Sequence, residues 1–276
     1  MRQHRVASGI VVVVVIVLFA SSLTAASLFP KPIHLVRKVD DSISGSSVTV
    51  DEYCAGNRIV TVRGMFVSIV DYDKQELTEI DHTNGTYAVT RFEEIAKARS
   101  HNGSPAAAAA LKKNDQPSEP KWKSTPLGAK ASTAGRSVES VEIVRDHPKE
   151  KIDVGIDRQI ALSKEAIEVL IGASYPNSHS EELDLILGAA APAHSGRANV
   201  ASVEGESYGL PAEQTITIES DNAVITLHSA ILAVNNDSVP PQLLMIDAHA
   251  KRVESRITRT NKELEQLDQL PSASKP

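Results

Sequence analysis

The sequence has little of what usually reveals a function. A single cysteine, Cys54, occurs among 276 residues, which excludes an internal disulfide and any zinc site built on several cysteines. Aromatic residues make up 4%, so Val, Ile, Leu and Ala must build the core. The net charge of −6 argues against nucleic acid as a partner, because phosphate binding requires a basic surface.

Catalytic motifs are missing from the sequence too. The 9 histidines include no pair spaced as in a zinc-protease helix, and there is neither a Gly-x-Ser-x-Gly elbow nor a glycine-rich phosphate loop. Cys54 has no Lys or His immediately beside it to lower its pKa. We therefore expect a non-enzymatic protein with no catalytic residue, no metal and no cofactor. The alternative is a hydrolase whose site has no recognisable motif.

Three pairs of titratable residues stand close together in the chain and are candidates for acid–base or cation sites. Aspartate between strands more often forms turns, because its side chain accepts hydrogen bonds from nearby backbone amides. We therefore interpret all three as turn residues; they are Asp71 with Asp73, Asp81 with His82, and Asp247 with His249.

An unbroken apolar run is the most prominent feature present. Residues Gly9–Ala20 follow Arg2 and Arg5, and small residues come next. This order is typical of a secretory signal, and we expect a cut after Ala26. The alternative is an uncleaved inner-membrane anchor, because the uncharged stretch before Lys31 is long enough to span a bilayer of about 30 Å. Both interpretations place residues 27–276 outside the cytoplasm, in the periplasm or tethered to the membrane.

The first half of the exported part alternates between apolar and polar residues, with turn signals between the segments. Such alternation predicts an antiparallel meander with one apolar face. Asn84-Gly85 indicates a hairpin with a type I′ turn. The predicted strands are Ser47–Tyr53, Arg58–Arg63, Phe66–Val70, Glu76–Asp81 and Thr86–Thr90.

Helical and strand patterns follow in the second half, after a segment rich in Ala, Pro and Lys. Residues 100–137 are predicted to be a flexible low-complexity insert, because prolines interrupt any regular element. The predicted helices are Arg91–Arg99, Ser163–Leu170, Glu181–Ala191 and the charged Lys251–Leu270. The predicted strands are Ser137–Arg145, Lys151–Leu162, Thr215–Glu219, Ala223–Val234 and Leu243–Ile246.

These patterns divide the chain into five parts. They are the signal or anchor 1–26, the first part of a β-rich domain 27–99, the insert 100–137, the second part of that domain with helices 138–250, and a charged C-terminal helix and tail 251–276.

The order of the segments carries a family resemblance. The run from Val48–Val62 through Ile69–Asp71, Leu77–His82 and Thr86–Val89 to a helix at Phe92–Ala98, and later Ser207–Pro211 before a hairpin, resembles exported bacterial proteins of the outer-membrane lipoprotein carrier superfamily. The resemblance covers more than half of the chain. It implies an α+β fold: a curved antiparallel sheet, open as a half-barrel, with a few covering helices and preceded by an N-terminal hydrophobic helix.

The same resemblance implies a concave face that shelters a lipid or another apolar ligand. Either face of the meander could be the inner one. The face that we expect to line the cavity carries Val60, Val62, Phe66, Ile69, Ile80, Tyr87 and Val89. The alternative function is that of an envelope interaction module, in which the helix at 252–270 pairs with a protein partner. An uncleaved N-terminal segment would make the membrane a partner as well.

Overall fold

The computed structural model describes residues 27–102, 122–146, 149–174, 180–191, 207–220 and 223–268. The predicted signal or anchor at 1–26 lies outside these residues, as does most of the first half of the predicted insert. None of the described helices combines the length and the apolar character needed to cross a bilayer.

The described chain forms two compact units that are interleaved in sequence. Unit 1 holds residues 35–50 and the described part of 120–234, whereas unit 2 holds 29–34, the described part of 51–119, and the chain from 235 onward. Strands β1 (Phe29–Asp41) and β2 (Ser46–Gly56) contribute residues to both units.

The strands form one large open sheet. Across the described residues they are hydrogen-bonded in the order β12-β6-β5-β4-β3-β2-β1-β11-β10-β9-β8-β7. The sheet is mixed, because β12 pairs with β6 in parallel, while the neighbouring pairs within each unit that have a defined register are antiparallel. The expected β-rich architecture with an antiparallel sheet and a few helices is confirmed, and the short pair of β12 with β6 makes the sheet mixed at this edge.

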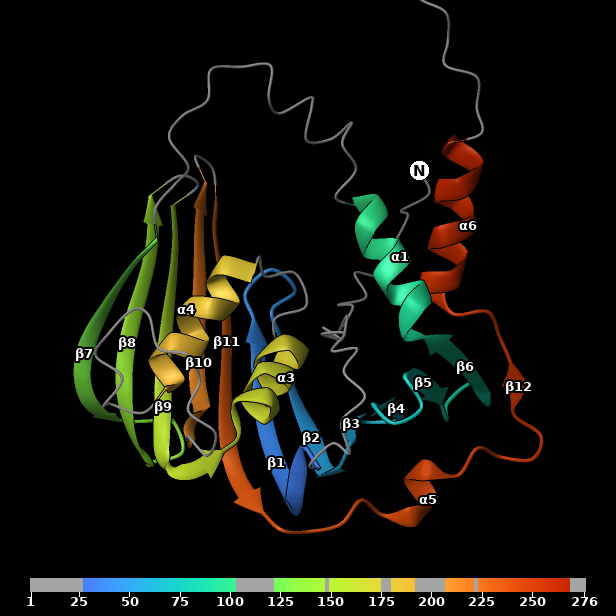
Figure 1. Ribbon diagram of the computed structural model, residues 1–276, viewed down its shortest axis with the longest axis horizontal. Coiled ribbons are helices and arrows are strands. Elements are labelled where there is room, and N and C mark those ends of the chain that lie inside the picture. The colour runs from blue at the N-terminus through green and yellow to red at the C-terminus, as the bar shows by residue number, and fades with distance from the viewer. Residues whose placement is uncertain are drawn as a thin grey trace, which may run out of the picture. The chain divides into compact units, whose positions relative to one another are not determined.

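Unit 1 places two helices on one face of its strands (Figure 1). Ile152, Val154 and Ile156 of β9 are at most 1% exposed and alternate along that face. Burying such side chains contributes about 1.5–3 kcal/mol each. The remaining elements are β7 (Lys123–Ala131), β8 (Ser137–Asp146), β9 (Lys149–Leu162), α3 (Lys164–Ser174), α4 (Ser180–Ala190), β10 (Tyr208–Ser220) and β11 (Ala223–Asn235).

Unit 2 contains the predicted meander, with one helix leading out of it and a second packed on the first. Helix α1 directly follows β6 and lies beside α6 (Figure 1). Phe92 and Ile95 of α1 are both 3% exposed. The elements are β3 (Arg58–Arg63), β4 (Phe66–Asp71), β5 (Glu76–Asp81), β6 (Thr86–Arg91), α1 (Phe92–Asn102), α5 (Pro241–Leu244), β12 (Lys251–Arg252) and α6 (Arg256–Asp268).

Aspartate forms the turns of the meander in the way that the sequence predicts. Asp71 Oδ1 accepts the backbone N–H of Lys74 at 3.0 Å, and Asp81 Oδ1 accepts those of Thr83 and Asn84 at 2.9 and 3.1 Å. The hairpin at Asn84-Gly85 is confirmed, but its connection is four residues long and Asn84 is not left-handed. A type I′ turn is therefore wrong, because the aspartate holds a wider turn in which only the last residue has a positive φ.

Three elements differ from the predictions, each for a physical reason. β7 lies inside the range predicted as a flexible insert. The sheet accepts Pro126 there because the strand is at the edge and the pairing shifts between Pro126 and Gly128. The predicted strand Leu243–Ile246 is wrong, since α5 occupies its first half and begins at a proline suited to a first helical turn. β1 was not predicted, because Pro30 and Pro32 obscure its start.

The turn geometry gives a stability prediction. Gly85 has a φ of 58° and an added Cβ would meet no atom within 4 Å, so Gly85→Ala adds backbone strain alone. We expect this change to lower the free energy of unfolding by about 1 kcal/mol.

Gln75 is the last residue of the equivalent turn between β4 and β5 and has a φ of 55°. Gln75→Gly relieves the same strain and, after the entropy cost of glycine, should stabilise by about 0.5 kcal/mol. Chemical denaturation checks both, and equal destabilisation by the two changes would contradict the assignment.

Candidate functional site

The residues predicted to line a cavity lie on two faces. Strand register brings Val60, Ile69 and Val89 into one row, and Val62, Ile80 and Tyr87 into the next row of the same face. Phe66 pairs with Arg63 and Asp81, so its side chain points to the opposite face, and it is 55% exposed. The spacing between Phe66 and Ile69 is odd, and successive residues of a strand alternate between faces.

The shared face is covered by the chain itself. Val60, Val62, Val67 and Ile80 form a buried cluster, and Tyr53, Ile69 and Tyr87 pack against it. Val239, Leu243 and Leu244, from α5 and the residues just before it, also pack against this cluster. The apolar face of the meander is thus part of the core of unit 2.

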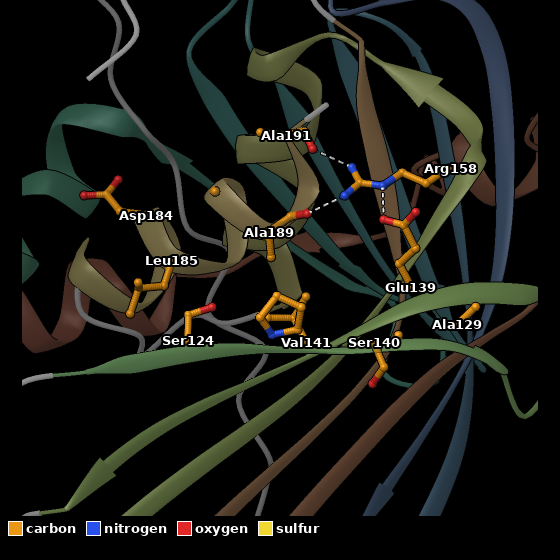
Figure 2. A pocket seen from close by; sticks show the side chains of 13 residues that line it. Ser124, Ala129, Glu139, Ser140, Val141, Arg158, Asp184, Leu185, Ala189 and Ala191 are labelled. Atoms are coloured by element: carbon orange, nitrogen blue, oxygen red, sulfur yellow. Dashed lines mark hydrogen bonds and ion pairs between the residues drawn. The ribbon is translucent and has the colours of Figure 1, made fainter. Parts of the chain in front are cut away.

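A cleft of about 580 Å³ lies in unit 1, between α4 and strands β7, β8 and β9 (Figure 2). Its lining is mostly small or apolar, with a few polar groups. The lining residues are Ser124, Pro126, Gly128, Ala129, Glu139, Ser140, Val141, Arg158, Asp184, Leu185, Gly188, Ala189 and Ala191.

Small side chains on both walls keep the cleft open. Pro126 pairs with Val141, and Ala129 pairs with Glu139, so these four share the face that α4 covers. On the helix, Gly188 is exposed, and a Cβ added there would meet nothing within 4 Å. Larger residues at these positions would fill the space between helix and strands.

Arg158 on β9 joins the strands to the end of α4. Its Nε donates to Glu139 Oε2 at 2.8 Å, and its terminal nitrogens donate to the carbonyl oxygens of Ala189 at 2.9 Å and Ala191 at 2.7 Å (Figure 2). A further bond goes to the carbonyl oxygen of Ala190 at 2.5 Å. The last carbonyls of a helix have no partner within the helix and carry its negative dipole end. Arg158 therefore satisfies these acceptors and holds α4 over the cleft.

A second polar cluster lies in unit 1 and does not line the cleft. Glu213 is 8% exposed and accepts hydrogen bonds from the backbone N–H of Thr133 at 3.2 Å and from its hydroxyl. His228 lies between two carboxylates, with Nε2 3.3 Å from Glu213 and Nδ1 3.5 Å from Asp40. The Thr133 hydroxyl contacts the carboxylate and not the imidazole, so the order of a catalytic triad is not formed.

The carboxylates of this cluster are stabilised in their charged form. Burial raises the pKa of Glu213, but hydrogen bonds from Thr133 and His228 and the charge of Lys130 outweigh it, so the pKa lies below its ordinary value of 4.5. Hydrogen bonds from Ser47 and Lys38 lower the pKa of Asp40 to about 2. Ionised carboxylates with lowered pKa values are weak bases, which fits ion pairing better than proton abstraction.

A third polar cluster lies in unit 2. His34 is 7% exposed and stacks on Tyr53, with ring centroids 4.1 Å apart. Its Nε2 lies 2.9 Å from Asp51, and its Nδ1 lies 3.5 Å from Asp237. Burial raises the pKa of Tyr53, and the two carboxylates add to this effect. Because Asp237 precedes the residues that cover the core cluster, His34 helps to hold that cover in place.

The remaining candidates have structural roles. Asp71 bonds a turn amide and forms an ion pair with Arg58 at 2.8 Å, and Asp247 accepts the backbone N–H of His249 at 2.8 Å. Cys54 is buried at 1% exposure. Within the described ranges, no group of three His, Cys, Asp or Glu side chains is arranged to hold a metal ion.

No family model and no curated protein matches the sequence. Among solved structures, one of PNGF-II is similar, with a TM-score of 0.35 and 8% sequence identity, over 85% of this chain and 32% of that chain. This chain therefore spans about a third of the length of that structure. Similarity at this level carries no argument about function.

The Arg158 contacts give a prediction about α4. Arg158→Met keeps the apolar part of the side chain but removes the guanidinium N–H donors. The carbonyl oxygens at the end of α4 and the Glu139 carboxylate then lose these hydrogen bonds. We expect a loss of about 1–3 kcal/mol in the free energy of unfolding of unit 1, with faster hydrogen exchange in α4 than in α3. Arg91→Met is the matched control, since Arg91 forms an exposed pair with Glu93 at 3.5 Å. Equal effects of the two changes would show that Arg158 does not hold α4.

The lowered pKa of Glu213 predicts a pH dependence. Its stabilising contribution is complete above the ordinary value of 4.5 and is lost as the pH falls through the lower pKa of the folded protein. Glu213→Gln should therefore destabilise the protein at neutral pH and weaken the acid dependence of its unfolding as the pH falls below 4.5. Denaturation at several pH values measures this, with Glu263→Gln as an exposed control. Parallel pH profiles for wild type and Glu213→Gln would contradict the prediction.

Proposed function

We propose that this protein is an exported, non-enzymatic binding protein of the lipoprotein-carrier-like fold, and that it holds an apolar ligand in the cleft between α4 and strands β7–β9. The cleft itself carries the proposal. Its volume of about 580 Å³ falls within the range of roughly 300–1,000 Å³ typical of small-molecule sites.

The lining suits an apolar ligand. Pro126, Val141 and Leu185 offer apolar surface, and the small residues beside them leave room for a ligand body. Removing apolar surface from water contributes about 25 cal/mol per Å². The hydroxyl of Ser124, on the face that α4 covers, is available to orient the ligand, whereas Ser140 lies between Glu139 and Val141 in β8 and points to the opposite face.

Binding without catalysis fits the same lining. Its described residues include no histidine and no cysteine, so neither serine hydroxyl has an imidazole beside it. The Thr133–Glu213–His228 cluster, which comes nearest to a hydrolase arrangement, lacks the contact between hydroxyl and imidazole.

Export and the half-barrel are parts of this proposal. The apolar run at Gly9–Ala20 supports export, by a cleaved signal or by an anchor in the inner membrane with the body outside the cytoplasm. The open sheet, with two helices on one face of unit 1, supports the carrier-like fold.

Pairing of the C-terminal helix with a protein partner has less support. Thr258 of α6 donates to the carboxylate of Glu94 at 2.7 Å, and Asn261 donates to the carbonyl oxygen of Glu94 at 2.8 Å. The described face of α6 that carries these residues is thus engaged with α1.

Filling the cleft provides the test. Gly188→Leu projects into open space and replaces a poor helix former with a good one, so the fold should be retained. We expect wild-type protein to bind the uncharged fluorophore N-phenyl-1-naphthylamine with increased emission, and Gly188→Leu to weaken binding by about 10-fold or more, as loss of one buried apolar contact implies.

Glu165→Leu is the matched control. It adds the same side chain at an exposed position of α3 that does not line the cleft, and it should bind as wild type does. No binding by wild type, or equal binding by Gly188→Leu, would overturn the proposed site.

A further inference from the structure

The charges around the cleft specify the ligand further, if the cleft is the binding site proposed above. Three charged side chains line it: the guanidinium of Arg158 and the carboxylates of Glu139 and Asp184. Arg158 already donates to Glu139 and to three carbonyl oxygens at the C-terminus of α4. Its single positive charge is thus compensated both by the Glu139 carboxylate and by the negative end of the α4 dipole.

Asp184 is the carboxylate left without a compensating charge. It is exposed in the first half of α4, and no basic side chain among the described residues forms an ion pair with it. On α3, the carboxylate of Glu168 interacts with the charge of Asp184, and Lys164 pairs with Glu168 at 3.6 Å. The pKa of Glu168 is raised, mainly by burial, with the charge of Asp184 contributing.

We propose that the cleft selects apolar ligands that carry a cationic group, such as an alkyl or aryl ammonium, over anionic ones such as fatty acids. The apolar body contacts Pro126, Val141 and Leu185, and the cation lies toward Asp184. An anionic head group would meet the carboxylate of Asp184, and Arg158 has four of its five N–H donors engaged. The net charge of −6 over the whole chain acts in the same direction.

A set of probes with one chain length and different head groups tests this inference. In this assay, N-phenyl-1-naphthylamine bound to the full-length protein is titrated with dodecyltrimethylammonium, dodecanoate or dodecyl maltoside. Each probe is kept below its critical micelle concentration. We expect the cation to bind about 3- to 10-fold more tightly than the anion, with the neutral probe between them, as is typical for one partly exposed charge pair. The preference should shrink as the salt concentration rises from about 20 mM to about 500 mM.

Variants of Asp184 test whether its carboxylate causes the preference for the cationic probe. Asp184→Asn should reduce the preference for the cation about 3-fold or more while leaving dodecyl maltoside binding unchanged. Asp184→Glu should retain it, which separates loss of charge from loss of fold. Asp247→Asn removes an exposed carboxylate of unit 2 and should change nothing.

The possible outcomes separate the two proposals. Displacement by all three probes with equal affinity, or an unchanged preference in Asp184→Asn, overturns this inference and leaves the proposed function standing. Failure of the wild type to bind any probe overturns the proposed function itself.

Discussion

The architecture of unit 1 depends on one guanidinium group that connects a strand to a helix. Arg158 extends from β9 and reaches the final carbonyls of α4, and on the way it contacts Glu139 of β8. The three carbonyl partners would otherwise lack a hydrogen-bond donor in a partly buried place. The length of the arginine side chain also sets how closely the helix approaches the strands. A shorter link would let α4 settle onto β8 and remove the space between them.

A histidine between two carboxylates occurs in each unit. In unit 1, His228 lies between Glu213 and Asp40, and in unit 2, His34 lies between Asp51 and Asp237. In both cases the imidazole links segments that are far apart in the sequence. These two histidines therefore cross-link the fold, which spacing along the sequence could not reveal.

Much of the fold could be predicted from local pattern. The meander, the two helices of unit 1 and the later hairpin were recognised, because alternation and helical period are properties of short windows. β1 and β7 were not recognised, since both carry prolines, and whether a strand tolerates proline depends on its place in the sheet. The error at Leu243–Ile246 also depends on context, because Leu243 and Leu244 pack against strands that are distant in the sequence.

The candidate site was harder to predict than the fold. Alternation correctly showed that Val60, Val62 and Ile80 face inward, but it could not show that Val239 and Leu244 cover them. The cleft is formed by small residues from two strands and a helix, which have no distinctive spacing. Arg158 leaves no signal either, because three of its four partners are backbone carbonyls.

The position of the cleft at the open edge of the sheet has a consequence for solubility. Its floor includes β7, whose outer backbone groups face no neighbouring strand among the described residues. An edge of this kind is a template on which another chain can add a strand and start aggregation. Pro126, the shifted pairing beside it and the charges of Lys123 and Lys130 interrupt that template. Pro126, which lies in the floor of the cleft, therefore also weakens this edge as a template for strand addition.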